Sequence, residues 1–185
     1  MTKDILEDGE TRMKGAITSL ESDLQGYRTG RASPHLLDKI VVEVYGTEMK
    51  LIQIATISVP EPQQLGIRPF DQTSISAIER AILKSDLGLM PNNDGKIIRL
   101  NIPRLTEERR RDLTKLVSKR VEEAKVAVRN VRRDILEFLR DLKNEGEISE
   151  DELHQAMDTL QKLTDHYIDE VEKHGKQKEA EIMEV

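Results

Sequence analysis

Five basic side chains between residues 125 and 140 are the groups in this chain best suited to chemistry. They are Lys125, Arg129, Arg132, Arg133 and Arg140, called here the basic stripe. Steps of three and four residues return to one face of a helix, so a helix would place them on one surface. The planar guanidinium of arginine donates two parallel hydrogen bonds to phosphate oxygens. Binding to the phosphate backbone of RNA is therefore one interpretation of this surface.

The alternative interpretation is a solvated helix face, because Glu122, Asp134 and Glu137 are close enough in the sequence for ion pairs. The net charge of −6 favours that alternative only if it is spread evenly, and it is not. Residues 106–145 carry a net charge of +3, and residues 146–185 carry −8. Since salt screens surface charges beyond about 8 Å, the acidic segment need not cancel the stripe. Charge alone leaves both interpretations open.

Other kinds of site chemistry are excluded or unsupported. The chain has no cysteine, which excludes disulfides and thiolate chemistry. The histidines lack metal-ligand spacing, and the TGRAS string at residues 29–33 lacks the lysine of a phosphate-binding loop. No run reaches the roughly 18 apolar residues of a membrane span, and the acidic N-terminal stretch is unlike a signal peptide. We expect a cytoplasmic protein that is not an enzyme and has no catalytic residues, metal or cofactor.

A long helix must carry the basic stripe. Residues 106–145 contain neither glycine nor proline, and at 1.5 Å per residue they would form a rod of about 60 Å. Its apolar residues recur in steps of four and three, which indicates a packed helix. They are Val117, Val121, Ala124, Val128, Val131, Ile135, Phe138 and Leu142.

Two further helices show the same spacing. The first covers residues 1–27, with apolar residues from Leu6 to Tyr27. The second follows a turn at Gly146, and Ser149 with Glu152 forms the pattern of a capping box at its start. Because that turn is short, the second and third helices should be antiparallel neighbours, and the first should complete a three-helix bundle. We expect the ring of Phe138 and those of Tyr27 and Tyr167 to lie in this core, unavailable for stacking on bases.

Residues 30–105 follow different rules and predict a small inserted β/α/β domain. Strands are expected at residues 39–46, 52–59, 65–70 and 96–102, and a helix at residues 76–87. The fold class is therefore α+β: a long antiparallel three-helix bundle of residues 1–29 and 106–185, interrupted by this domain.

The insertion predicts a hinge between the small domain and the bundle. The chain enters the small domain from the end of the first helix and leaves it at the start of the long helix, so both connections lie at the same end of the bundle. Two short connections restrict twisting and allow bending. The alternative is two bodies locked by a packed interface. The predicted hinge positions are at residues 29–32 and 103–105, namely Thr29, Gly30, Arg31, Ala32, Pro103, Arg104 and Leu105.

Five motifs spread over the chain together resemble the bacterial ribosome recycling factor family. They are RTGRASP at 28–34, VVEVYGT at 41–47, SDLGLMPNNDG at 85–95, PRLTEERRRDLTK at 103–115 and AKVAVRNVRRD at 124–134. The resemblance implies an L-shaped molecule similar in outline to transfer RNA. It also implies a function: with elongation factor G and GTP, which that partner hydrolyses, the factor separates the ribosomal subunits after termination.

The resemblance also implies residue roles. Arg132 and Arg129 resemble contacts to large-subunit ribosomal RNA, with Arg133 as a helper. Lys125 is a candidate RNA contact because it belongs to the basic stripe, apart from the resemblance. Arg28 and Arg31 resemble residues at the bundle end that faces the peptidyl transferase region. The family often has a second proline where this chain has Arg104, which leaves the stiffness of that connection open.

Two other functions remain as alternatives. A structural coiled-coil protein would pair with a second copy through the rows of apolar residues on its helices and form a dimer. A bundle that buries those rows within one chain predicts a monomer. An RNA-binding protein would act without elongation factor G.

Overall fold

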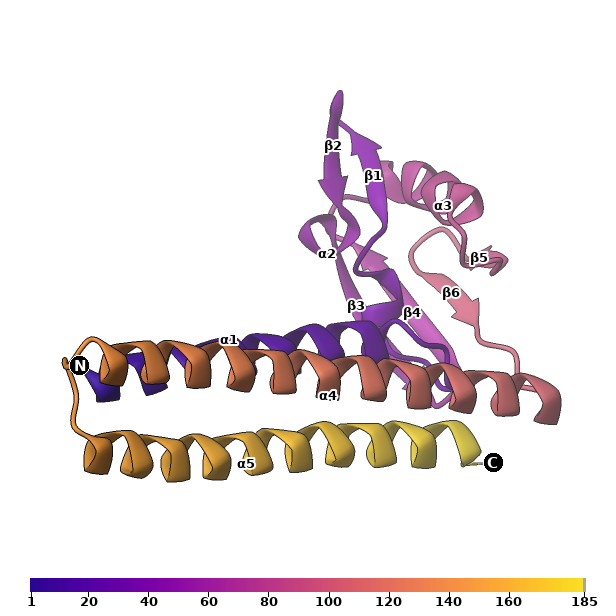
Figure 1. The fold of residues 1–185 in the computed structure, drawn as a ribbon. Helices are drawn as coiled ribbons and strands as arrows, with labels where there is room; N and C mark the ends of the chain where they lie inside the picture. The colour runs from indigo at the N-terminus through magenta and orange to yellow at the C-terminus, as the bar shows by residue number, and fades with distance from the viewer. Residues whose placement is uncertain (185) are drawn as a thin grey trace. The chain divides into compact units, whose positions relative to one another are not determined.

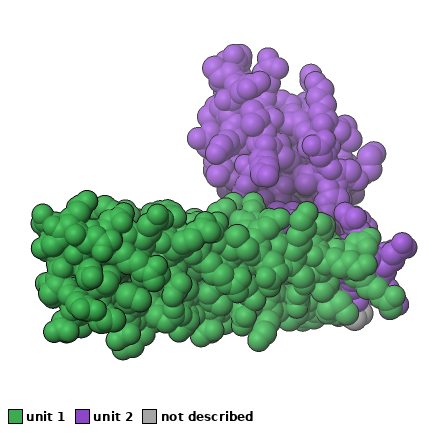
Figure 2. Space-filling model, in the orientation of Figure 1, with its two compact units in different colours: residues 1–24, 111–185 green, residues 25–110 purple. Residues whose placement is uncertain are grey.

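The computed structural model describes residues 1–184, which divide into two compact units (Figure 2). Unit 1 comprises Met1–Leu24 and Arg111–Val185, and unit 2 comprises Gln25–Arg110. None of the helices in the described part of the chain combines the length and apolar composition needed to cross a membrane. The division lies five residues from each boundary expected from the sequence, toward the interior of the bundle helices.

Three long helices make up unit 1: α1 (Thr2–Gln25), α4 (Glu107–Asn144) and α5 (Glu150–Met183) (Figure 1). The first few residues of α4 belong to unit 2. Contacts between the helices fix their directions. On α1, Arg12 pairs with Asp134 of α4 at 2.7 Å, and further along α1 Asp23 pairs with Arg120 of α4 at 2.6 Å. Partner numbers fall along α4 as they rise along α1, so α1 and α4 are antiparallel.

The third helix closes the bundle. On α5, the Val121 side chain of α4 lies against Gly175, whereas Arg132 of α4 bonds to Gln161, so α4 and α5 are also antiparallel. The Tyr167 hydroxyl of α5 donates to Glu10 of α1 at 2.8 Å. Each helix therefore contacts both others, and the predicted antiparallel three-helix bundle is confirmed.

The start of α5 is also as predicted. The Ser149 hydroxyl accepts a hydrogen bond from the Glu152 amide at 3.2 Å, and the Glu152 carboxylate accepts one from the Ser149 amide at 2.8 Å. The second bond lowers the pKa of Glu152. Ile148 and Leu153, on either side of this capping box, are both buried and hold the direction in which the chain enters the helix.

One expectation about the bundle core was wrong. The Phe138 side chain is 52% exposed, and Leu139, which is fully buried, takes its place in the core. The expected pattern alternated steps of four and three, which average 3.5 residues per turn, but a straight helix has 3.6. Over the 38 residues of α4 the buried stripe therefore drifts, and it continues from Ile135 by a step of four. Tyr167 is buried as expected, whereas Tyr27 lies beyond the end of α1 and is half-buried.

Unit 2 contains a hairpin, a four-stranded sheet and a helix (Figure 1). The hairpin pairs β1 (Val41–Val44) with β2 (Thr47–Lys50). The sheet has the order β3-β4-β6-β5 and is antiparallel throughout, with α3 (Ile75–Lys84) packed against β1. The sheet strands are β3 (Ala55–Glu61), β4 (Gln64–Pro69), β5 (Pro91–Asn93) and β6 (Ile98–Asn101). Three short helical turns complete the unit: Pro34–Leu37, α2 (Leu51–Ile54) and Gln72–Ser74.

The expected β/α/β pattern omitted two strands and misplaced one boundary. β2 and β5 were not predicted, because β2 is mostly polar and exposed and β5 consists of turn-forming residues. The strand expected at residues 52–59 begins with the helical turn α2 instead. Leu51 and Ile54 of α2 are buried while Ile52 is exposed, which is helical spacing.

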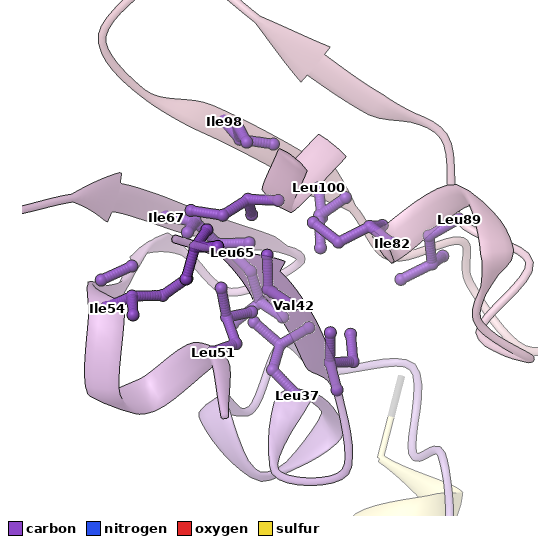
Figure 3. Packing of buried hydrophobic residues seen from close by; sticks show 14 of the residues in the cluster. Leu37, Val42, Leu51, Ile54, Leu65, Ile67, Ile82, Leu89, Ile98 and Leu100 are labelled. Carbon is purple, nitrogen blue, oxygen red and sulfur yellow. The ribbon is translucent and has the colours of Figure 1, made fainter. Parts of the chain in front are cut away.

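Unit 2 has its own hydrophobic core (Figure 3). Strands β1, β4 and β6 each contribute two buried side chains, and α3 contributes two more. These residues are Val42, Val44, Leu65, Ile67, Ile98, Leu100, Ile78 and Ile82. Because this core is built without residues of unit 1, unit 2 has an independent source of stability.

Close helix packing in unit 1 generates a stability prediction. A Cβ atom at Gly175 would lie 2.6 Å from Cγ2 of Val121, a stiff β-branched side chain, whereas one at Gly15 would meet nothing within 4 Å. We expect Gly175→Ala to destabilise the protein by about 1–3 kcal/mol through overpacking. The matched control Gly15→Ala should stabilise it by up to about 1 kcal/mol, because alanine favours the helix. Urea unfolding measures both changes, and equal stabilities of the two variants would contradict the packing described.

Candidate nucleic-acid interface

The five residues of the basic stripe all lie on α4 within unit 1, but the structure divides them into two groups. Arg129, Arg133 and Arg140 are exposed. Arg132 is half-buried, and the Lys125 side chain is only 15% exposed. The stripe is therefore an exposed arginine surface with a lysine at its inner border.

Lys125 is occupied in holding helices together. Its Nζ atom lies 3.0 Å from the Glu172 carboxylate on α5 and 3.3 Å from the Glu122 carboxylate on α4. The hydrogen bond to Glu172 raises the pKa of Lys125 and lowers the pKa of Glu172. The ion-pair interpretation therefore holds for this member of the stripe, because its charge is already balanced by carboxylates of the bundle.

The arginines have different surroundings. The Nε atom of Arg132 donates to the Gln161 side-chain oxygen on α5 at 3.0 Å. Arg133 donates through a terminal nitrogen to Asn130 on its own helix at 3.2 Å. Neither bond involves an acidic residue, so both guanidinium charges stay uncompensated by a direct ion pair in the described structure.

Two of the three acidic residues near the arginines in the sequence pair with other cations. Asp134 pairs with Arg12 of α1 at 2.7 Å. Within residues 1–184, Glu137 forms no ion pair with a member of the stripe, and Glu122 pairs with Lys125 alone. Asp134 and Glu122 are thus engaged by cations other than the four arginines. The remaining exposed cations suit the oxygens of a phosphate backbone.

Arg28 and Arg31 belong to unit 2. The Arg28 guanidinium donates to the backbone carbonyl of Asp86 at 3.2 Å and to that of Leu87, and so ties the chain near residue 28 to the loop that follows α3. Arg31 is exposed. Arg28 therefore has a structural role within unit 2 that the sequence did not indicate.

The residues predicted to form a hinge also have defined contacts within unit 2. Gly30 has a φ of 77°, and a Cβ there would lie 3.4 Å from the Leu105 side chain, so the two connections lie against each other. The Ala32 amide donates to the Pro62 carbonyl at 2.8 Å, and the Ile102 amide donates to the Gln63 carbonyl at 2.7 Å. Both connections are thus anchored to one turn of unit 2.

Comparison with known proteins identifies the relatives of this chain. The model of the family described as ribosome recycling factor matches residues 20–183. The chain belongs to the ribosome recycling factor family. Two relatives named ribosome-recycling factor cover it fully and are themselves covered fully: one from Halalkalibacterium halodurans is 57% identical and one from Bacillus subtilis is 51% identical.

Solved structures of ribosome recycling factors share the fold. A solution structure of a ribosome recycling factor superimposes with a TM-score of 0.80 at 46% identity and covers 100% of this chain and 98% of its own. A second structure describes the Thermus thermophilus factor and the Escherichia coli elongation factor G bound to the E. coli post-termination complex. It matches with a TM-score of 0.69 at 43% identity over both full chains. The α+β fold class and the family resemblance drawn from the motifs are confirmed.

Sequence reasoning missed the contribution of α5 to the arginine surface. Gln161 contacts Arg132, and the Gln161 amide nitrogen in turn donates to Asp165 at 2.8 Å. Gln161 and Asp165 are four residues apart, so the sequence alone could have predicted their contact on one face of a helix. Nothing in the sequence links Gln161 to Arg132, because the two helices must first be paired in register.

The Lys125–Glu172 contact predicts a pH dependence. Because the pKa of Glu172 is lower in the folded chain, this pair contributes its full stability above about pH 4.5, the ordinary pKa of glutamate. The contribution is lost as pH falls through the lowered pKa. We expect Glu172→Gln to lose less stability than the parent chain between pH 7 and about pH 3 in urea unfolding.

Glu123 of α4 is a suitable control, since it is exposed and forms no ion pair within the described residues. Glu123→Gln should follow the parent chain across the same pH range. An identical pH dependence in Glu172→Gln and the parent would contradict a stabilising role for the pair.

Proposed function

We propose that this protein binds the large ribosomal subunit after termination and, with elongation factor G and GTP, splits the post-termination ribosome for reuse. The observation that carries the proposal is the arginine surface of α4, whose arginines form no ion pair within the described residues and whose neighbours Asp134 and Glu122 pair with other cations. Membership of the ribosome recycling factor family supports it, as does a related factor described with elongation factor G on a post-termination complex.

The proposed docking residues are the arginines of α4. Arg132 and Arg129 contact phosphates of large-subunit ribosomal RNA, and Arg133 assists them. Lys125 contributes indirectly by holding α4 to α5. Arg28 and Arg31, which belong to unit 2, face the peptidyl transferase region. This assignment makes binding sensitive to salt, because each phosphate contact releases counterions.

The proposed mechanism is mechanical. Unit 1 docks on ribosomal RNA, and elongation factor G pushes unit 2, which bends about the connections at residues 29–32 and 103–105. The strain is then transmitted to the contacts between the subunits. GTP is hydrolysed by the partner, and this chain makes and breaks no covalent bond. A separate core in unit 2 supports the proposal, because a unit with its own core can be pushed without unfolding.

The protein is proposed to act as a monomer in the cytoplasm. The apolar seams of α1, α4 and α5 face one another within one chain, and this arrangement leaves them unavailable for a coiled-coil dimer. Sedimentation equilibrium distinguishes the two possibilities, since the coiled-coil alternative requires a dimer. An RNA-binding role without elongation factor G is distinguished by light scattering of post-termination ribosomes with and without that factor.

The first functional prediction concerns Arg132. We expect Arg132→Ala to weaken binding to isolated large ribosomal subunits by about 1–3 kcal/mol, the range for a charged hydrogen bond, and to leave the fold intact. Arg80→Ala is the matched control, because Arg80 is an exposed arginine on α3 and its removal changes the net charge equally. Filter binding at fixed salt measures both, and unchanged affinity in Arg132→Ala would reject the assignment.

The second functional prediction concerns bending. The chain has no cysteine, so one cysteine introduced into each unit can be joined by a bifunctional maleimide without side reactions at native thiols. We expect the cross-linked protein to bind large subunits normally but to fail in splitting post-termination ribosomes. The same double variant without the cross-linker is the control. Splitting that persists after cross-linking would remove bending from the mechanism.

A further inference from the structure

Arg132 differs from the other arginines of the basic stripe in what holds it. Its Nε atom bonds to Gln161 on α5, whereas Arg133 bonds to Asn130 on its own helix. In the described part of the chain, Arg129 and Arg140 form neither a side-chain hydrogen bond nor an ion pair. Arg132 is also half-buried, while the other three arginines are exposed. Arg132 is therefore the arginine of the stripe that a second helix restrains.

Because Gln161 binds the Nε atom of Arg132, the terminal nitrogens of the guanidinium remain available to a ligand. An arginine side chain has five N–H donors, one on Nε and two on each terminal nitrogen. Gln161 occupies the Nε donor, so the four donors on the two terminal nitrogens remain available for a phosphate. Those two nitrogens form the end of the guanidinium fork that binds two phosphate oxygens side by side.

Gln161 is itself oriented by a neighbour. Its amide nitrogen donates to the Asp165 carboxylate at 2.8 Å, so its amide oxygen is directed to Arg132. Asp165 thereby orders the glutamine without neutralising the arginine by a direct ion pair. A direct carboxylate partner would compete with phosphate for the guanidinium, whereas an amide oxygen is a weaker acceptor and leaves the positive charge free to act on a ligand.

We propose that Gln161 is a positioning residue for RNA binding, which holds the Arg132 guanidinium in the orientation that presents its two terminal nitrogens to a phosphate. This inference rests on the proposed role of Arg132 in docking to ribosomal RNA. A free arginine side chain loses substantial rotamer entropy when it binds. Gln161 removes part of that cost before binding by ordering the side chain in the unbound protein.

The test compares Gln161→Met with the matched control Gln177→Met. Methionine is similar to glutamine in size and helix propensity, and both glutamines are exposed on α5, so neither change should alter urea unfolding. Binding of the full chain to isolated large ribosomal subunits is measured over a range of salt. We expect Gln161→Met to bind about three- to tenfold more weakly, which corresponds to the cost of immobilising one long side chain. Gln177→Met should bind as the parent does.

The salt dependence separates positioning from direct contact. Arg132→Ala removes a phosphate contact and should lower the slope of log affinity against log salt by about one. Gln161→Met keeps that contact and should lower the affinity without changing the slope. In the Arg132→Ala background, Gln161→Met should have no further effect.

Each contrary outcome has a distinct meaning. If Arg132→Ala weakens binding but Gln161→Met does not, or if Gln161→Met weakens binding equally in both backgrounds, the positioning role is overturned while the proposed docking residue stands. If Arg132→Ala leaves the affinity and slope unchanged, the docking assignment fails and the inference about Gln161 fails with it.

Discussion

The close packing of α4 against both α1 and α5 is the constraint on which unit 1 depends. Glycine allows the approach at both ends of the bundle, where Gly9 lies against Ile135 and Gly175 lies against Val121. Between these points Ala124, Val128 and Val131 of α4 are buried. Most of the stability of a long helix comes from packing of its apolar face. The stability of α4 therefore depends on its packing against both α1 and α5.

The register of the helices also determines which charged residues of the bundle form ion pairs. Cations at the borders between helices find acidic partners on the neighbouring helix: Arg12 pairs with Asp134, and Arg120 with Asp23. Tyr167 of α5 also has an acidic partner on a neighbouring helix, because its hydroxyl donates to Glu10 of α1. Burial of the Tyr167 side chain raises its pKa to about 12. Arg132 and Arg133 bond to amide oxygens instead of carboxylates, so their charge is available to an external ligand. A protein with a net charge of −6 can therefore present a cationic surface on α4.

Unit 2 is stabilised by other means, and this difference suits the proposed mechanism. Its core comes from an antiparallel sheet, a hairpin and α3, and its two connections to the helices are anchored to the turn at Pro62 and Gln63. Under the proposed mechanism, a unit with its own core can be pushed while its sheet stays intact.

The sequence by itself determined the three helices, the capping box at Ser149, the α+β class and the family, because these depend on local spacing or on motifs contiguous in the chain. Only the tertiary structure decided that Leu139 replaces Phe138 in the core, since small differences from 3.5 residues per turn accumulate along a long helix. It also decided that Lys125 is engaged by Glu172 and that Gln161 restrains Arg132. Those contacts join residues far apart in the chain, and they exist only once two helices have fixed their register.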